Sequence, residues 1–235
     1  MTGQLRKRSV LITGGSKGIG FATAMQLLKH GHRVVALSRT PPPEPNPRLT
    51  WIESDVTQLE KIEKSLPQIA SEHQIDALLS NAGQPSFGNI EEWSSEQISE
   101  HLKTNLLSHM VVASALMPHL RMQNTSDLIF MGSIAAIKPG KKASVYIAAK
   151  AGLKGFAQSL RYEASSKGVR VSLIQPGMVQ TDFYNHQSFT PGEHPSQHLK
   201  ALDVAALVDH ILQAPPSVVF DECTLSPINH VVQKS

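Results

Sequence analysis

Tyr146 and Lys150 stand four positions apart in the stretch "SVYIAAK", whose alanines favour a helix. Positions i and i+4 lie on the same face of a helix, so the phenol and the ammonium come within reach of each other. Lowering a tyrosine pKa from about 10 to about 7 or 8 needs roughly 3 to 4 kcal/mol, and one ammonium supplies part of this. The pair therefore predicts a proton-transfer site completed by a second cation or a positively charged ligand. The alternative is a half-buried ring beside a solvated lysine.

A glycine-rich stretch, "TGGSKGIG", follows the first apolar run and leads directly into an apolar helix. Glycines at a strand-to-helix turn let the backbone approach a diphosphate, and the helix N-terminus adds free N–H groups and positive potential. The spacing of Gly14, Gly18 and Gly20 matches neither GxGxxG nor a Walker loop, so ATP binding is disfavoured. The stretch predicts a dinucleotide site, with a tight turn that serves only the fold as the alternative.

Ser38 and Arg39 stand where an NAD-specific site places an acid, at the end of the second strand. Arg39 suits a 2′-phosphate, and Lys17 in the glycine loop supplies a second cation. The nearest acid, Glu44, lies beyond three prolines. These residues favour NADP(H) over NAD(H), although both cations also fit an ordinary solvated surface.

These side chains must be positioned by alternating strands and helices. Short aliphatic runs begin at Ser9 (SVLI), Arg33 (RVVAL), Leu49 (LTWIE), Asp76 (DALLS), Asp127 (DLIFMG), Arg170 (RVSLI) and Ser217 (SVVF). Helical spacing covers 21–30, 59–71, 95–122, 146–166 and 203–212. Strands that alternate with helices build a parallel sheet covered on both faces. The sequence predicts a single-domain, doubly wound α/β fold of about seven strands over 1–235, with the proline-rich segment 41–47 as a stiff surface loop.

Composition narrows the class of protein. The chain has 235 residues with 40% hydrophobic residues, 22 Lys+Arg and 19 Asp+Glu, so its formal charge of +3 argues weakly for nucleic-acid or membrane partners. Its single cysteine, Cys223, excludes an internal disulfide and fits a reducing compartment. The first residues lack the apolar core of a signal peptide, no run reaches membrane length, and the 11 histidines form no HExxH pattern. We expect a cytoplasmic protein without a metal site.

The motifs and their order resemble the short-chain dehydrogenase/reductases along nearly the whole chain. The matching pieces are TGGSKGIG at Thr13, DV at Asp55, NAG at Asn81, Asn105 in a long helix, Ser133, YIAAK at Tyr146 and PGMVQT at Pro176. This resemblance implies hydride transfer between NADP(H) and a carbonyl or alcohol, with Tyr146 as general acid or base.

The resemblance also assigns roles to individual residues. Ser133 binds the substrate oxygen, Lys150 holds the nicotinamide ribose and favours the phenolate of Tyr146, and Asn105 anchors a water that links Lys150 to solvent. The cofactor-binding set implied is Gly14, Ser16, Lys17, Gly18, Ile19, Gly20, Ser38, Arg39, Asp55, Val56, Asn81, Ala82, Gly83, Tyr146, Lys150, Pro176, Gly177, Val179 and Thr181. In this family Asn81 and Gly83 also hold the central strands together. For these two residues the resemblance therefore implies both a structural role and a cofactor-binding role.

Substrate choice in this family lies mostly after the PG turn, here in 182–203. That polar, histidine-rich segment is either a lid with Phe183, Tyr184 and Phe189 as apolar contacts, or an irregular connection. The stretch FDECTLSPINHVVQKS lacks the family's DGG finish, which places the usual tetramer contact in doubt.

Two other functions and an assembly state complete the expectations. A non-catalytic NADP-binding regulator on the same fold is the main alternative, and it predicts erosion of the catalytic set. A serine hydrolase would need a GxSxG elbow, which "MGSIA" lacks. Small residues of the helix from Tyr146, with Leu153, Phe156 and Leu160 as apolar contacts, predict a homodimer through a helix bundle that includes the 95–122 helix; a tetramer is the larger alternative.

Overall fold

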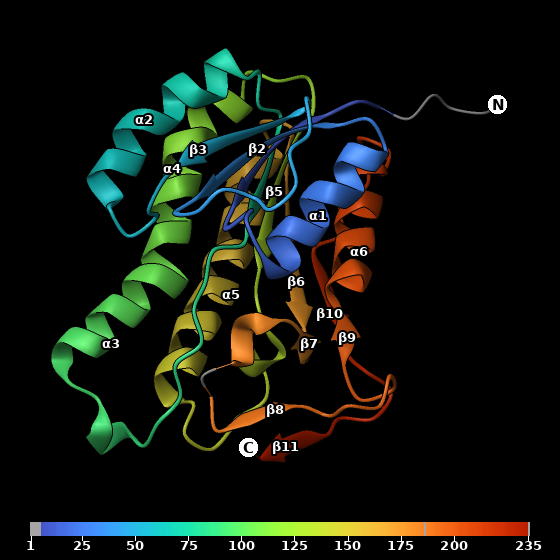
Figure 1. Ribbon diagram of the computed structural model, residues 1–235. Coiled ribbons are helices and arrows are strands. Elements are labelled where there is room, and N and C mark those ends of the chain that lie inside the picture. The colour runs from blue at the N-terminus through green and yellow to red at the C-terminus, as the bar shows by residue number, and fades with distance from the viewer. Residues whose placement is uncertain (1–5, 186, 235) are drawn as a thin grey trace.

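The computed structural model describes residues 6–185 and 187–234 and is built around a seven-stranded parallel sheet (Figure 1). The strands are β1 (Ser9–Thr13), β2 (Arg33–Ser38), β3 (Leu49–Glu53), β4 (Ala77–Ser80), β5 (Ser126–Met131), β6 (Val169–Pro176) and β10 (Glu222–Leu225). Their order across the sheet is β10-β6-β5-β4-β1-β2-β3. The predicted doubly wound α/β fold is confirmed.

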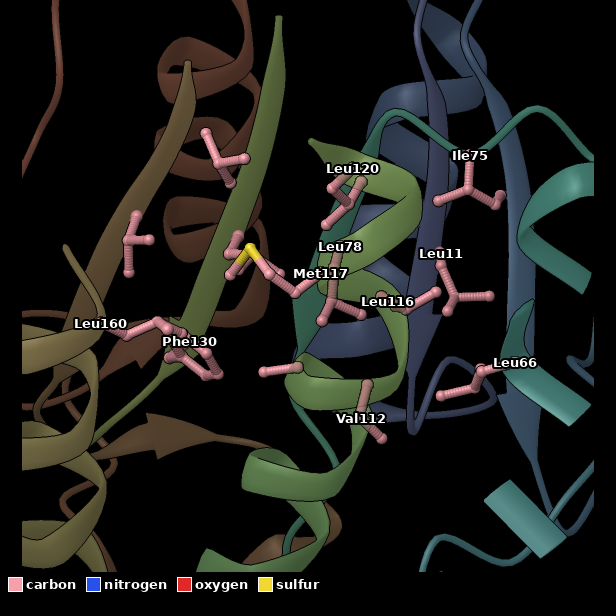
Figure 2. Close-up of a cluster of buried hydrophobic side chains, with 14 of the residues drawn as sticks. Leu11, Leu66, Ile75, Leu78, Val112, Leu116, Met117, Leu120, Phe130 and Leu160 are labelled. Atoms are coloured by element: carbon pink, nitrogen blue, oxygen red, sulfur yellow. The ribbon is translucent and has the colours of Figure 1, made fainter. Parts of the chain in front are cut away.

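Helices cover both faces of the sheet. Helices α1 (Gly18–Lys29) and α6 (Ala201–Gln213) lie on one face, and α2 (Leu59–Glu72), α4 (Ser108–Leu120) and α5 (Ser144–Ser165) lie on the other (Figure 1). Alternation along β1 divides its side chains between these layers: Val10 and Ile12 pack against α1 and α6, whereas Leu11 packs beneath α2 and α4 (Figure 2). Burial on both faces explains why β1, β2, β4, β5 and β6 read as continuous apolar runs, whereas the edge strands β3 and β10 are partly exposed.

The long helix predicted over 95–122 is interrupted. It consists of α3 (Ser95–Leu102), a π-helical turn (Lys103–Leu107) and α4. Asn105 lies in the π-helical turn and is fully buried. Such turns are frequent at functional sites because the wider winding redirects side chains and frees backbone groups.

The last strand of the sheet begins later than predicted. Residues 217–220 form a turn and an extended segment outside the sheet, and pairing starts at β10, where Glu222 aligns with Leu173. The guanidinium of Arg170 explains this difference, because its Nη1 donates to the carbonyl oxygens of Ala214, Pro215 and Val218 at 3.0 to 3.1 Å. This connection is therefore folded around a side chain of the neighbouring strand.

The segment after the PG turn contains regular structure. It begins with a 3₁₀ helix (Asp182–Tyr184) and contains β8 (Phe189–Pro191), which pairs antiparallel with β11 (Val232–Lys234). Its β9 (Leu199–Lys200) pairs in parallel with β7 (Val179–Gln180). These elements are short, and the lid and the irregular connection predicted for 182–203 both stay predictions; His186 lies outside the described residues. Helix α6 begins at Ala201, two residues before the predicted 203.

The remaining connections agree with the sequence. The proline-rich residues 41–47 form a largely exposed loop between β2 and β3. Within residues 6–185 and 187–234, no helix combines the length and apolar character needed to cross a bilayer.

Candidate active site

A cleft of about 750 Å³ opens at the carboxyl ends of the strands. It lies between β1 and β4, where the strand order of the sheet reverses direction. Ligands usually bind at this position in an open parallel sheet. The predicted residues that line it are Gly14, Ser16, Lys17, Gly18, Ile19, Ser38, Arg39, Asp55, Val56, Asn81, Ala82, Gly83, Ser133, Tyr146, Lys150, Pro176, Gly177, Val179 and Thr181. Gly20 and Asn105 are buried behind its wall.

The glycine loop has the backbone geometry of an anion cradle. Gly14 and Gly18 have φ of +69° and +55°, a region that side-chain-bearing residues rarely adopt. A Cβ on Gly20 would collide with the carbonyl oxygen of Gly14, so a side chain there would disrupt the turn. Helix α1 begins at Gly18 without a side-chain cap, which leaves its first N–H groups and its positive dipole end directed at the cleft. These features fit a dinucleotide diphosphate.

Asn81 fixes the glycine loop to the centre of the sheet. Its Nδ2 donates to the carbonyl oxygens of Thr13 (3.1 Å) and Gly14 (3.3 Å), and its backbone N–H donates to Oγ1 of Thr13 (2.9 Å). The hydroxyl of Thr13 also accepts the N–H of Ala82 at 3.0 Å. The side chain of Asn81 therefore acts as a structural support, and the NAG backbone forms the floor of the cleft.

Two cations flank one end of the cleft. Lys17 and Arg39 are exposed, whereas Ser38 is buried and donates its hydroxyl to the carbonyl oxygen of Thr40 at 2.7 Å. The pKa of the nearby Asp55 carboxyl is lower than its usual value. Burial alone would raise this pKa, but hydrogen bonds from the backbone N–H and the hydroxyl of Thr57, together with the charge of Arg39, outweigh burial. This end of the cleft combines an ionised carboxylate with two exposed positive charges.

Tyr146 and Lys150 project from the first turns of α5 into the other end. Tyr146 is 8% exposed and Lys150 is 4% exposed. Burial raises the pKa of Tyr146 to about 12, partly offset by a hydrogen bond with Ser133, and burial lowers the pKa of Lys150 to about 8. The Nζ of Lys150 donates to the carbonyl oxygen of Met131 at 2.9 Å. In the protein alone desolvation therefore favours the neutral phenol of Tyr146, and its ionisation beside Lys150 and a positively charged nicotinamide stays a prediction.

Asn105 is held behind this pair by neighbouring backbone. Its Oδ1 accepts the N–H of Gln84 at 3.2 Å, and its Nδ2 donates to the carbonyl oxygens of Gln84 (3.2 Å) and His101 (3.1 Å). A Cβ built on Gly83 would lie 3.0 Å from Oδ1 of Asn105 and 3.9 Å from Nζ of Lys150, so the three residues meet. Full burial excludes the simple alternative of a solvated asparagine on a helix surface.

The PG turn closes the cleft opposite the glycine loop. The N–H of Gly177 donates to the carbonyl oxygen of Leu225 at 2.7 Å, which fixes the turn to β10. Thr181 accepts the N–H of Phe183 at 3.3 Å, and its methyl group faces Gly18, where a built Cβ would lie 3.7 Å away. The two turns therefore approach each other closely across the opening.

Comparison with known families identifies this arrangement. The family model described as short chain dehydrogenase matches residues 8–190 of the chain. The chain belongs to the short-chain dehydrogenase family. It is therefore an oxidoreductase, and this family uses nicotinamide cofactors.

Individual relatives differ in substrate and cofactor. Carbonyl reductase family member 4 of Danio rerio is 32% identical over 183 residues, which cover 74% of this chain and 77% of that protein. A serine dehydrogenase in its closed form with NADP⁺ is 25% identical with a TM-score of 0.81, covering 92% of this chain and 94% of that one. A 3-ketoacyl-(acyl-carrier-protein) reductase from Brucella melitensis complexed with NADH is 20% identical with a TM-score of 0.84, covering 94% and 97%. One fold thus accommodates either dinucleotide.

Several residues of this short-chain dehydrogenase site were not found from sequence. Phe87 packs on Tyr146 with ring centroids 5.2 Å apart, and the rings of His101 and Tyr146 are 5.9 Å apart. The signal for Phe87 was an isolated aromatic residue in the polar, turn-rich stretch "QPSFGN". His101 had none, because a histidine in a polar helix ordinarily faces solvent. In residues 6–185 and 187–234, no group of three His, Cys, Asp or Glu side chains is arranged to hold a metal ion.

Proposed function

We propose that this short-chain dehydrogenase transfers a hydride between NADP(H) and a carbonyl or alcohol substrate, with Tyr146 as general acid and base. The supporting observation is that Ser133, Tyr146 and Lys150 line the same cleft as the glycine loop. We also propose that 1–235 acts as a single oxidoreductase domain in which 182–203 contacts substrate.

The cofactor-binding residues form a continuous track. In our proposal the diphosphate lies at the glycine loop, the adenine at Asp55 and Val56, and the nicotinamide beside the PG turn and Lys150. When bound, the reduced cofactor supplies the hydride. The fit rests on the positive φ of Gly14 and Gly18 and on the uncapped N-terminus of α1.

The protein side chains complete the chemistry at oxygen. A phenol with a pKa of about 12 is protonated near neutral pH, so Tyr146 can donate a proton to the oxygen of a carbonyl being reduced. Ser133 orients that oxygen by a hydrogen bond, and Lys150 binds the ribose and supplies positive charge when the phenol ionises. Alcohol oxidation reverses these roles.

The choice of NADP(H) rests on two exposed cations that line the cleft, Lys17 in the glycine loop and Arg39 after the end of β2. Neither is part of an ion pair among the described residues, which leaves both available to a 2′-phosphate. The NADP-binding regulator is the second candidate, and its predicted erosion is absent from this site, since Asn105, Ser133, Tyr146 and Lys150 are all present.

The partners follow from the same reasoning. We propose a small-molecule carbonyl or alcohol as substrate, a homodimer as the assembly, and the cytoplasm as location, the last because Cys223 has no second cysteine to pair with in this chain.

Tyr146→Phe tests the function. A panel of ketones, aldehydes and alcohols is first assayed with NADPH and NADH by nicotinamide absorbance. With a substrate that the parent accepts, Tyr146→Phe should lower kcat by about 10²- to 10⁴-fold while NADPH affinity stays within a few fold. Lys150→Ala should weaken both cofactor binding and rate. Near-parent turnover by Tyr146→Phe would remove the assignment, and dinucleotide binding without any turnover would favour the regulator.

A further inference from the structure

Two buried side chains, one helical turn apart, hold the stretch that runs from the end of β4 into the cleft. Asn105 in the π-helical turn binds the backbone of Gln84. His109 in the first turn of α4 has its Nδ1 2.7 Å from Oγ of Ser80, the last residue of β4, and this contact is a hydrogen bond. The proposed chemistry uses Asn105 but gives His109 no task.

The alternation of β4 brings Ser80 and His109 together. Side chains two residues apart on a strand point to the same face, so Ser80 shares its face with Leu78, which packs in the core layer of α4 (Figure 2). Ser80 and His109 are each 1% exposed, so neither polar group can turn to water instead. Nε2 of His109 has no partner among the described residues, which leaves Nδ1 as the bonding nitrogen.

The ring of His109 is neutral and also touches the cleft floor. Burial, followed by the charge of Lys150, lowers its pKa to about 3, although a hydrogen bond with the backbone of Ala82 acts in the opposite direction. His109 therefore contacts the NAG segment, residues 81–83, as well as the serine that precedes it.

The NAG segment is held from two sides. On the side of β1, the hydroxyl of Thr13 accepts two backbone N–H groups of this segment. On the side of the helix, His109 holds the residue before the segment and Asn105 holds the residue after it. Of the described residues, 81–84 line the cleft, whereas His109 lies behind them. His109 can therefore act on a ligand only through the backbone that it holds.

We propose that His109 is a positioning residue for the dinucleotide, which fixes the NAG segment through Ser80 so that this segment meets the cofactor. The proposal rests on the proposed function, in which residues 81–83 bind the dinucleotide. Without the hydrogen bond the segment shifts, and part of the binding free energy is used to restore its position. NADPH and NADH should weaken equally, because Lys17 and Arg39 are untouched.

The test measures the dissociation constants of NADPH and NADH by fluorescence titration in the absence of substrate. His109→Leu removes Nδ1 but keeps an apolar side chain in the core, and Ser80→Ala removes only the hydroxyl. Each variant should raise both dissociation constants at least about fivefold. With a carbonyl compound that the parent reduces, kcat at saturating NADPH should stay within about twofold, because the groups of α5 that act at the oxygen are unchanged.

Further variants isolate the hydrogen bond at Nδ1. The amide of His109→Asn lies where Nδ1 was, so this variant should return to within about twofold of the parental affinity. The amide of His109→Gln lies nearer the position of Nε2 and should restore much less. The double variant Ser80→Ala with His109→Leu should bind NADPH about as well as the weaker single variant, because the same bond is lost in all three.

The controls lie at the opposite end of the same elements. His119 is also on α4, but its Nε2 lies 3.0 Å from the carbonyl oxygen of Ile75, which precedes β4. Ser126 begins β5 and donates its buried hydroxyl to the carbonyl oxygen of Leu120. His119→Leu and Ser126→Ala should lower the urea midpoint of unfolding and leave both dissociation constants at the parental value.

The outcomes separate the two proposals. A parent that binds neither dinucleotide would remove the proposed function and the positioning role together. If the parent binds and oxidises NADPH, the positioning role alone is overturned by parental affinity in His109→Leu and Ser80→Ala, by equal weakening in the controls, or by a double variant whose effect is the product of the single effects. Should His109→Leu not fold, Ser80→Ala and His109→Asn decide by the same criteria.

Discussion

Nδ2 of Asn105 lies 3.2 Å from Nε2 of His101, one helical turn earlier along the chain. An amide N–H only donates, so Nε2 must accept and the imidazole proton must reside on Nδ1. His101 is 1% exposed, and burial, followed by the charge of Lys150, lowers its pKa to about 4. The ring is therefore a neutral acceptor at physiological pH, and it helps to hold Asn105 in the π-helical turn beside Lys150.

Replacing His101 should affect the rate through Asn105. His101→Leu removes the acceptor but keeps an apolar side chain, so kcat should fall about tenfold or more while the KM for NADPH changes little. His101→Gln restores an acceptor and should recover most of the loss. Steady-state kinetics, with circular dichroism to confirm folding, provide the measurement. Equal kcat values for the parent and His101→Leu would show that Asn105 needs no support from this ring.

Cofactor preference should depend on Arg39. If Arg39 and Lys17 bind the 2′-phosphate, each contact contributes about 1.5 to 3 kcal/mol, or about 10- to 150-fold. Arg39→Ala should weaken the binding of NADPH and leave the binding of NADH unchanged. Ser38→Asp should reverse the preference, because its carboxylate would repel the 2′-phosphate of NADPH and accept hydrogen bonds from the ribose hydroxyls of NADH. Fluorescence titration of both reduced cofactors measures these affinities. Equal weakening of both by Arg39→Ala would make Arg39 an ordinary surface cation.

A homodimer should form through the exposed face of α4 and α5. A groove of about 350 Å³ between these helices is lined by Met110, Ala113, Met117, Phe156 and Leu160, among other residues. Ala148, Ala151 and Gly155 are exposed on α5, whereas Leu153 is fully buried in the core and cannot serve as the predicted contact. Phe156→Glu should shift the mass measured by light scattering from dimer to monomer. A parent that is monomeric at micromolar concentration would contradict the prediction.

Two buried histidines should make the fold sensitive to acid. Burial, followed by the charge of Lys150, lowers the pKa of His109 to about 3 as well as that of His101 to about 4. The unfolded chain binds these protons near pH 6.5, so stability is present above that pH and is lost as pH falls towards 4. Each ring should contribute about 1.4 kcal/mol per pH unit in that window. Urea unfolding at pH 7, 6 and 5 should give a shallower decline for His101→Leu than for the parent; parallel declines would refute this.

The amino ends of the central strands are joined by a buried ion network. Oδ2 of Asp127 lies 2.8 Å from Nη2 of Arg8 and 2.9 Å from Nη2 of Arg170. Asp127→Asn leaves Arg170 without a counter-ion and Arg8 with Asp76 alone, and should cost about 3 to 5 kcal/mol of unfolding free energy.

An exposed pair provides the control for this network. Asp221 lies 2.7 Å from Nε of Arg161, but its side chain is 67% exposed. Asp221→Asn should therefore cost less than about 1 kcal/mol, because water screens the pair. Similar unfolding midpoints in urea for both variants would show that burial does not decide the value of these ion pairs.

The sequence predicted those elements whose signal is local. Five strands of the main sheet were found because burial on both faces requires continuous apolar runs, and the partly exposed edge strand β3 was found from its short run LTWIE. The glycine loop was found because its turn requires residues without a Cβ. Two features were not predicted correctly: the start of the last strand and the interruption of the helix at Asn105. Both depend on contacts with residues far away in the sequence. Arg170, for example, binds carbonyl oxygens 44 to 48 residues away.

The same distinction holds for the site. Lys17, Arg39, Tyr146 and Lys150 lie in motifs with fixed spacing, and the structure brings them to one cleft. The rise in the pKa of Tyr146 in the protein alone could not be predicted from sequence, because it depends on how completely neighbouring segments cover the ring. Phe87 packs on Tyr146 only through the fold, so no local pattern marks this contact.

The pairing of β8 with β11 bears on how the molecule is made. Strands β1 to β4 lie within residues 9–80 and lead into the glycine loop, Arg39 and the NAG segment. Strand β8, which carries Phe189, can pair only after residues 232–234 of β11 have been synthesised. A chain that grows from its N-terminus therefore acquires the strands of its dinucleotide half early in translation, whereas β8 gains its partner strand only after 232–234 have been added.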